Sequence, residues 1–225
     1  HEVHPGASVV ASPPRNHFRL APAMEYLFVA GGIGITPLRS MILSMPEHRA
    51  WRLIYLGSRP ETMAYAGELI DRYGDRVLAH ASARSGRLDL REALAGGTPE
   101  VYCCGPAGLL DAVTSLVPRD RLHAERFEAV VRLGPEPVPF EVEAVRSRRR
   151  FRVGPGQSLL AALEAQGLPV EASCREGVCG SCELRVLSGR PLHLDSVLDD
   201  EEKDELGVMY PCVSRAQRGS LVLDV

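Results

Sequence analysis

The sequence CREGVCGSC at residues 174–182, together with the later Cys212, decides the fold of the second half of the chain. Its spacing, C-x4-C-x2-C followed by a distant cysteine, is the plant-type ligand pattern of a [2Fe-2S] cluster. Two irons need four thiolates, and this spacing draws three of them from one short loop. Gly177 and Gly180 can take the positive φ that such a loop requires, and inward backbone N–H groups suit the cluster's sulfides. We therefore predict four cluster ligands: Cys174, Cys179, Cys182 and Cys212.

Two other uses of these cysteines stay open at this stage. A structural zinc site favours two close ligand pairs, typically C-x2-4-C twice, whereas here the first gap is four residues and the fourth cysteine stands alone. A disulfide framework is compatible with six cysteines. Such frameworks are typical of small secreted domains, however, and the chain carries no secretory segment. The spacing favours the iron-sulfur interpretation over both.

The cluster motif, followed by VSRAQRGSLVLDV to the end of the chain, resembles the C-terminal ferredoxin domain of the phthalate dioxygenase reductase family. Proteins of that family carry an FMN barrel, a pyridine-nucleotide domain and a plant-type ferredoxin in one chain. The resemblance extends over nearly all of the 225 residues and involves several separate motifs. It implies an α/β nucleotide domain followed by an α+β ferredoxin domain.

Composition and charge limit the classes of function. With 45% hydrophobic residues the chain can bury sizeable cores in one or two domains, and its net charge of −3 gives no basic surface for nucleic acid. No apolar run approaches the length of a membrane span. Free and metal-bound thiols suit a reducing compartment, so we expect a cytoplasmic protein. Because the sequence begins with His1 rather than Met, we expect a piece of a longer chain.

From residue 24, short apolar runs alternate with helical stretches, which indicates βα units and a doubly wound parallel sheet. We predict strands at 26–30, 51–56, 77–80, 101–104 and 122–127, and helices at 37–44, 62–73, 89–94 and 107–116. Ligands of such sheets bind at the carboxyl ends of the strands. We assign this nucleotide-binding domain to residues 23–128. Residues 1–22 hold a short β-prone piece near Val9 and are either an ordered linker or, as the resemblance implies, a remnant of the flavin barrel.

The first strand end carries the glycine turn Gly-Gly-Ile-Gly-Ile-Thr-Pro. Gly32 and Gly34 would let the backbone approach a pyrophosphate, Thr36 is a suitable N-cap, and Pro37 suits a first helical turn. Any tight strand-to-helix turn can use such glycines, so the motif alone leaves a purely structural role open. It resembles the family's first nucleotide-domain motif, which implies that these four residues bind NADPH or NADH.

The second strand end predicts which nucleotide is bound. An NAD-selective site places an Asp or Glu there, whereas this chain has Ser58 and Arg59. A guanidinium can bind a 2′-phosphate in a bidentate fork, so the pair favours NADPH. A solvated arginine at the start of a helix is the structural alternative. Many members of the resembled family prefer NADH, and this departure leaves the choice of cofactor open.

The fourth strand end reads Cys103-Cys104-Gly105-Pro106. In the resembled family the cysteine before Gly-Pro lies by the nicotinamide, which implies a catalytic position for Cys104 and nucleotide contacts for Gly105 and Pro106. Cys103 is expected to be a packed thiol. Farther on, Glu125 and Phe127 at the fifth strand end are expected either to be structural or to contact a flavin edge.

A stretch rich in Gly and Pro at 132–139 marks a domain boundary, which gives a linker at 129–139 and a ferredoxin domain at 140–225. We predict a hairpin of strands 140–145 and 151–153, with a turn of arginines at 146–149 that is solvated or docks an acidic partner. A helix at 158–166, a strand at 183–187, an acidic helix at 198–206 and a last strand at 221–225 complete the order of a β-grasp fold.

Pyridine nucleotides deliver two electrons as a hydride, whereas a [2Fe-2S] cluster accepts one at a time. In the resembled family FMN separates the pair, in a barrel that we expect to be mostly missing here. The resemblance thus implies electron transfer from NAD(P)H through FMN and the cluster to an oxygenase, either a Rieske-type enzyme or a cytochrome P450, separate or fused. Two alternatives stay open: a ferredoxin-type electron carrier whose nucleotide domain is only a docking scaffold, and a zinc-stabilised binding module.

Overall fold

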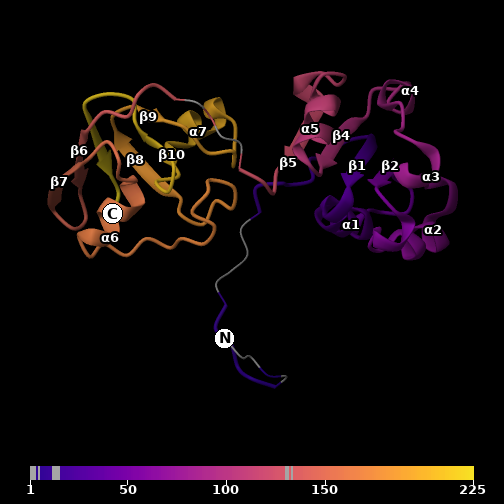
Figure 1. Cartoon of the computed structure of the whole chain (residues 1–225), viewed down its shortest axis with the longest axis horizontal. Coiled ribbons are helices and arrows are strands. Elements are labelled where there is room, and N and C mark those ends of the chain that lie inside the picture. The colour runs from indigo at the N-terminus through magenta and orange to yellow at the C-terminus, as the bar shows by residue number, and fades with distance from the viewer. Residues whose placement is uncertain (1–3, 5, 12–15, 130–131, 133) are drawn as a thin grey trace.

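The computed structural model describes residues 4, 6–11, 16–129, 132 and 134–225. Figure 1 shows two separate bodies, one built around strands β1–β5 and the other around β6–β12. The order, a parallel-sheet domain followed by a domain with a mixed sheet, is the predicted one. In the described part of the chain no helix is long and apolar enough to cross a membrane.

The first sheet has five parallel strands in the order β3-β2-β1-β4-β5, as expected of a doubly wound fold. The strands are β1 (Glu25–Gly31), β2 (Ala50–Gly57), β3 (Val77–Ala81), β4 (Glu100–Cys104) and β5 (Leu122–Glu125). The helices between them are α1 (Ile35–Ser44), α2 (Ala66–Tyr73), α3 (Ser82–Ser85), α4 (Leu90–Ala93) and α5 (Ala107–Thr114). Only the four-residue α3 was not predicted from the sequence.

Both faces of this sheet are covered, which explains why its central strands read as continuous apolar runs. Along β1, Tyr26 and Phe28 pack in a cluster with residues of α1 and α2. Leu27 and Val29 face the opposite cluster, which contains residues of α4 and α5. The carboxyl ends of β1 and β4 are therefore fixed between two cores.

The second sheet is mixed, in the order β10-β8-β12-β6-β7, with β12 parallel to β6 and the other pairs antiparallel. Its strands are β6 (Phe140–Ala144), β7 (Arg149–Val153), β8 (Leu184–Ser188), β10 (Val208–Met209) and β12 (Ser220–Leu223). Helix α6 (Leu159–Ala165) buries Leu159 and Leu163 in the core of this sheet. A small pair, β9 (Pro191–Leu192) with β11 (Arg215–Ala216), and helix α7 (Asp200–Leu206) complete the domain.

Several predicted element boundaries are wrong by two or more residues, among them the end of α5 at Thr114, the start of α7 at Asp200 and the end of β12 at Leu223. Helix α1 begins at Ile35 because a 3-10 turn at Gly32–Gly34 runs directly into it, so Thr36 lies inside the helix and is not its N-cap. Helix α2 begins at Ala66 rather than at 62 because Tyr65 adopts a left-handed conformation, φ 63°, which interrupts the helical path. Strand β5 ends at Glu125, two residues before the predicted end.

Two smaller predictions also need correction. Val9 lies in irregular structure and is 70% exposed, so residues 7–11 form no strand. The arginine turn spans 145–148, because Arg149 already pairs with Ala144 in the β6–β7 hairpin. By contrast, Ser158 caps α6 as expected, since its Oγ accepts a hydrogen bond from the Ala161 N–H at 3.1 Å.

Candidate iron-sulfur centre and nucleotide site

The four cysteines of the ferredoxin domain meet as two pairs. Hydrogen bonds between sulfurs join Cys174 to Cys179 and Cys182 to Cys212. Cys182 and Cys212 are buried, Cys174 is half-buried and Cys179 is exposed. The exposed member is therefore the one that another redox group or partner can approach.

The buried pair is anchored on helix α6. Cys182 and Cys212 share a cluster of buried side chains with Leu160 and Tyr210. The Leu160 N–H also donates to the carbonyl of Pro211 at 2.9 Å, which ties the distant cysteine's segment to the start of the helix. The packing of α6 thus brings the distant fourth cysteine to the loop.

Local geometry explains the small residues of the loop. Gly177 and Gly180 have φ of 74° and 71°, in the left-handed region. Beside them Ser181 accepts a hydrogen bond from the Ser173 N–H at 2.9 Å, and its Oγ lies 3.0 Å from the sulfur of Cys179. Partial burial opposes ionisation of Cys179, but hydrogen bonds from Ser181 and from the neighbouring cysteine outweigh it and lower its pKa to about 7.

The donor set fits a two-iron cluster better than a single metal ion. Among the described residues no three His, Cys, Asp or Glu side chains converge on a point where one ion could be held. A [2Fe-2S] cluster instead takes two protein ligands on each of its two irons, which matches two separate thiol pairs. A structural zinc ion needs all four ligands around one centre. The arrangement therefore favours the iron-sulfur interpretation over zinc.

In the nucleotide domain, the ends of β1 and β4 approach each other backbone to backbone. A Cβ added at Gly34 would overlap the carbonyl of Cys104 and lie 2.8 Å from the nitrogen of Gly105. A Cβ at Gly105 would lie 2.9 Å from the Cα of Gly31. Among the glycines at these two strand ends, only Gly32, with φ 54°, has open space around it. The sequence motif thus combines one conformational glycine with glycines required by packing.

The start of α1 presents the expected donors to the open end of the sheet. Helix α1 has 10 residues, and its first turn carries no acidic side chain. The Thr36 hydroxyl donates to the carbonyl of Ile33 at 2.9 Å, so it braces the turn and caps nothing. Pro37 occupies the third helical position. Free N–H groups at this helix end suit an anionic ligand.

Ser58 and Arg59 directly follow the end of β2 and are exposed. Their backbone carbonyls accept hydrogen bonds from Ala83 and Thr62, which fixes the loop. Within the described chain the Arg59 guanidinium has no hydrogen bond or ion pair. It is therefore available to an external anion.

Cys103 and Cys104 end strand β4 on opposite faces of the sheet, and both are fully buried. Burial, with a smaller contribution from the nearby Glu125 carboxyl, raises the pKa of Cys104 to about 12. Burial likewise raises the pKa of Cys103 to about 12. Both are neutral thiols at physiological pH, which fits a packing and positioning role for Cys104 and excludes a free thiolate.

A cavity of about 350 Å³ lies where the two domains meet. Its lining includes Glu125 and Phe127 after β5, the exposed Cys179, and His17 and Phe18 from the N-terminal segment. The His17 ring packs edge-on against Tyr210 at 6.5 Å and fills the space beside Gly180. His17 was missed as a candidate contact residue because only the fold brings it to the cluster loop.

Comparison with known proteins gives the family. Residues 142–217 match the family described as 2Fe-2S iron-sulfur cluster binding domain. The chain is 37% identical over 235 residues to the carnitine monooxygenase reductase subunit of Escherichia coli K12, covering 100% of this chain and 72% of that one. It is 36% identical to the structure of phthalate dioxygenase reductase, described as a modular structure for electron transfer from pyridine nucleotides to [2Fe-2S], and covers 68% of that protein.

The chain belongs to the phthalate dioxygenase reductase family. It is an oxidoreductase of the kind that serves as the reductase component of oxygenase systems. The family's ferredoxin domain carries a [2Fe-2S] cluster, and the matched residues contain all four cysteines of the two thiol pairs. The predictions of family, fold class and general function are confirmed.

Two solved structures match nearly the whole of this chain. An intact type IV self-sufficient cytochrome P450 monooxygenase matches 94% of this chain, and 29% of its own length, at 35% identity with a TM-score of 0.84. Phthalate dioxygenase reductase also matches 94% of this chain, at nearly equal identity, but with a TM-score of 0.56.

Proposed function

We propose that this chain passes electrons from NADPH or NADH, through FMN, to a [2Fe-2S] cluster held by Cys174, Cys179, Cys182 and Cys212. The observation that carries the proposal is the cavity between the domains. It lies between the end of β5, next to Cys104 at the hydride end, and the exposed sulfur of Cys179. A flavin ring edge there would be close to both redox partners.

In this scheme each group has a limited role. The bound flavin supplies the conversion of a hydride pair into single electrons. The N-terminus of α1, with Gly32, Gly34, Thr36 and Pro37, would hold the pyrophosphate. Gly105 and Pro106 would shape the nicotinamide pocket, and Cys104, neutral and buried, would position the ring without acting as a nucleophile.

We further propose NADPH as the preferred nucleotide. The support is the unpartnered guanidinium of Arg59 beside Ser58, at a strand end where no carboxylate is available for ribose hydroxyls. A 2′-phosphate would give this guanidinium the anion that it lacks in the described chain.

The electron acceptor is proposed to be an oxygenase, either a separate Rieske-type enzyme or a cytochrome P450 in the same polypeptide. The relatives' names point to both: one is a reductase subunit of a monooxygenase, another a self-sufficient P450. The high structural similarity to the P450 fusion favours the second. The alternative is a ferredoxin-type electron carrier whose nucleotide domain is only a docking scaffold, and the intact turn and helix end at the nucleotide site support the reductase over it.

The test is anaerobic reduction of the purified, cluster-containing chain. The described residues form two five-stranded sheets and one two-stranded sheet, and no barrel. NADPH alone should therefore leave the visible absorbance of the cluster unchanged, while NADPH with added FMN should bleach it. Dithionite should bleach it in either case. Fast bleaching by NADPH without flavin would refute the flavin step, and no nucleotide binding by calorimetry would favour the plain carrier.

The ligand assignment has its own control. Changing Cys174, Cys179, Cys182 or Cys212 to Ser should remove most of the cluster absorbance, because each thiolate holds one coordination position. Cys103→Ser should keep it, since that thiol packs in the other domain. A colourless protein with one bound zinc would support the zinc module instead.

A further inference from the structure

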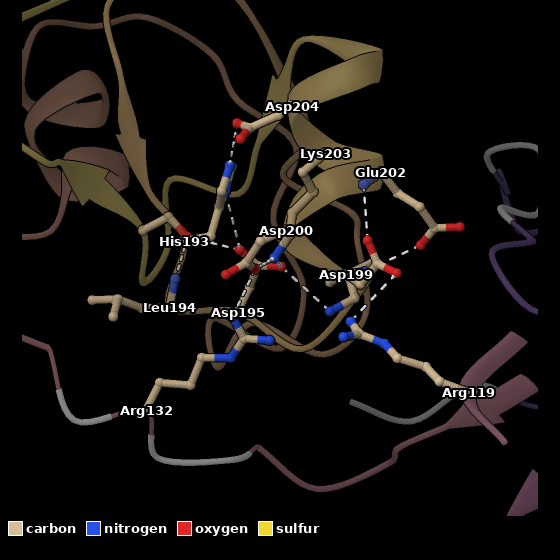
Figure 2. Close-up of polar contacts among 12 residues, drawn as sticks. Arg119, Arg132, His193, Leu194, Asp195, Asp199, Asp200, Glu202, Lys203 and Asp204 are labelled. Atoms are coloured by element: carbon tan, nitrogen blue, oxygen red, sulfur yellow. Dashed lines mark hydrogen bonds and ion pairs between the residues drawn. The ribbon is translucent and has the colours of Figure 1, made fainter. Parts of the chain in front are cut away.

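Helix α7 buries a charged side chain behind the cluster loop. Its sequence, DEEKDEL, is a run of acidic residues around a single cation, Lys203, which is 0% exposed. The Lys203 ammonium lies 2.9 Å from a carboxylate oxygen of Asp195 and 2.9 Å from one of Asp200 (Figure 2). The helix thus points its only cation into the domain.

The partner Asp195 is also buried, at 1% exposure, and both of its oxygens are used. One accepts from Lys203 and from the Val197 N–H, at 2.9 and 3.3 Å. The other accepts from the Ser214 hydroxyl at 2.8 Å. Ser214 in turn accepts from the Leu194 N–H at 3.1 Å, and the buried His193 ring lies 4.0 Å from the same Asp195 oxygen.

Asp195 lies against both segments that carry the cysteines, through its backbone on one side and its carboxylate on the other. A Cβ at Gly177, inside the loop, would lie only 3.0 Å from the Cα of Asp195, and the Ser196 N–H donates to the Gly177 carbonyl at 2.8 Å. On the other side Ser214 follows Cys212 by two residues. Asp195, the anion of the buried ion pair, therefore joins the loop of three cysteines, through the backbone, to the segment of the fourth, through Ser214.

The network continues toward the other domain. Asp200, which shares the ammonium, also accepts from Arg132 in the linker at 2.7 Å. These contacts lower the pKa of Asp200, against the effect of its partial burial, so the carboxylate stays charged at neutral pH. The linker, α7 and the cluster loop are thus connected by charged contacts.

A buried ion pair is a poor device for stability alone, because desolvation offsets most of its attraction and apolar residues of similar size do as well. Its value lies in a fixed geometry. We propose that Lys203 and Asp195 are positioning residues for the cluster, holding its two cysteine segments in register and setting the local charge that the cluster senses. This inference depends on the proposed cluster ligands.

The test compares two variants of the cluster-loaded chain, one that removes a buried positive charge and one that removes a buried negative charge. Lys203→Met removes a buried cation, so it should lower the midpoint potential, because the reduced cluster carries one more negative charge. Asp195→Asn removes an anion and should raise the potential. Both should release iron to a chelator about tenfold faster than the unmodified chain, the usual scale for outer contacts of a metal site. Glu205→Gln, an exposed acid on the same helix, is the matched control and should change neither.

If the two residues have a purely structural role, both variants should lose iron faster, but the midpoint potential of the cluster should not move in opposite directions. That outcome would overturn the proposal. Should Lys203→Met or Asp195→Asn not fold, Asp200→Asn carries the test, because its side chain is 55% exposed and its loss leaves the ammonium on Asp195. It must then raise the potential, and an unchanged potential refutes the idea. An unmodified chain without any [2Fe-2S] spectrum would instead refute the proposed function.

Discussion

The two domains use cysteine in opposite ways. At the end of β4, Cys103 and Cys104 are sealed between two apolar cores, and burial raises the pKa of each to about 12. In the cluster loop, Cys179 is exposed, and hydrogen bonds that outweigh its partial burial lower its pKa to about 7. The sheet end is shaped by backbone packing, whereas the loop depends on polar contacts from distant segments. Cysteine is thus a packing residue in the first domain and a proposed cluster ligand in the second.

The sharpest test of this contrast is thiol alkylation in the cluster-free chain at pH 8. A group with pKa about 7 is then mostly thiolate, whereas one with pKa about 12 is almost wholly protonated. Thiolate populations should differ on the order of ten-thousandfold, and iodoacetamide should label the exposed Cys179 well before the buried Cys104. Peptide mapping by mass spectrometry would measure this. Labelling of Cys104 before Cys179 would contradict the assigned environments, and loading the cluster should protect Cys179.

The next effect concerns backbone packing at the nucleotide end. Gly34→Ala should destabilise the domain by about 3 kcal/mol or more, because its Cβ would overlap the carbonyl of Cys104 and neither backbone can yield. Gly108→Ala is the matched control, since a Cβ there meets nothing within 4 Å and lies in helix α5. It should stabilise by up to about 1 kcal/mol. Urea unfolding measures both, and equal stabilities would show that the sheet ends can separate.

These two regions also differ in how far the sequence predicts them. The glycines of the β1 turn and the cysteine spacing are local patterns, and the structure places each at the expected strand end or loop. Thr36 was wrongly predicted as a cap because a 3-10 turn before α1 is not visible in residue preferences. Lys203 was missed because an acidic helix with one lysine looks solvated throughout. Its burial depends on Asp195 and Ser214, which only the closed domain brings near it.

A third prediction concerns the nucleotide. If Arg59 holds a 2′-phosphate, Arg59→Ala should weaken NADPH binding by about 1.5 to 3 kcal/mol, the range for a lost hydrogen bond to a charged group, and leave NADH nearly unchanged. Arg84→Ala is a comparison variant, because that exposed arginine already lies 3.8 Å from Glu61. Calorimetric titration with both nucleotides decides the matter. Equal loss for NADPH and NADH, or no loss, would make Arg59 an ordinary surface residue.

The smallest effect is expected where the two domains touch. Arg119, before β5, lies 3.8 Å from Asp199, and the linker's Arg132 lies 2.7 Å from Asp200 (Figure 2). Both pairs are partly exposed, so each should contribute less than about 1 kcal/mol, and the longer Arg119 pair less than the other.

Added salt should therefore change the relative placement of the two domains before it affects either hydrophobic core. Raising the salt concentration shortens the range of exposed ion pairs but leaves buried contacts almost unaffected. Small-angle scattering should show a larger radius of gyration in high salt, with unchanged circular dichroism and cluster spectrum. Arg132→Ala should produce much of this expansion in low salt, and Arg119→Ala little of it. If neither salt nor Arg132→Ala changes the scattering, apolar contacts hold the junction, and the charged residues of α7 serve only the cluster side.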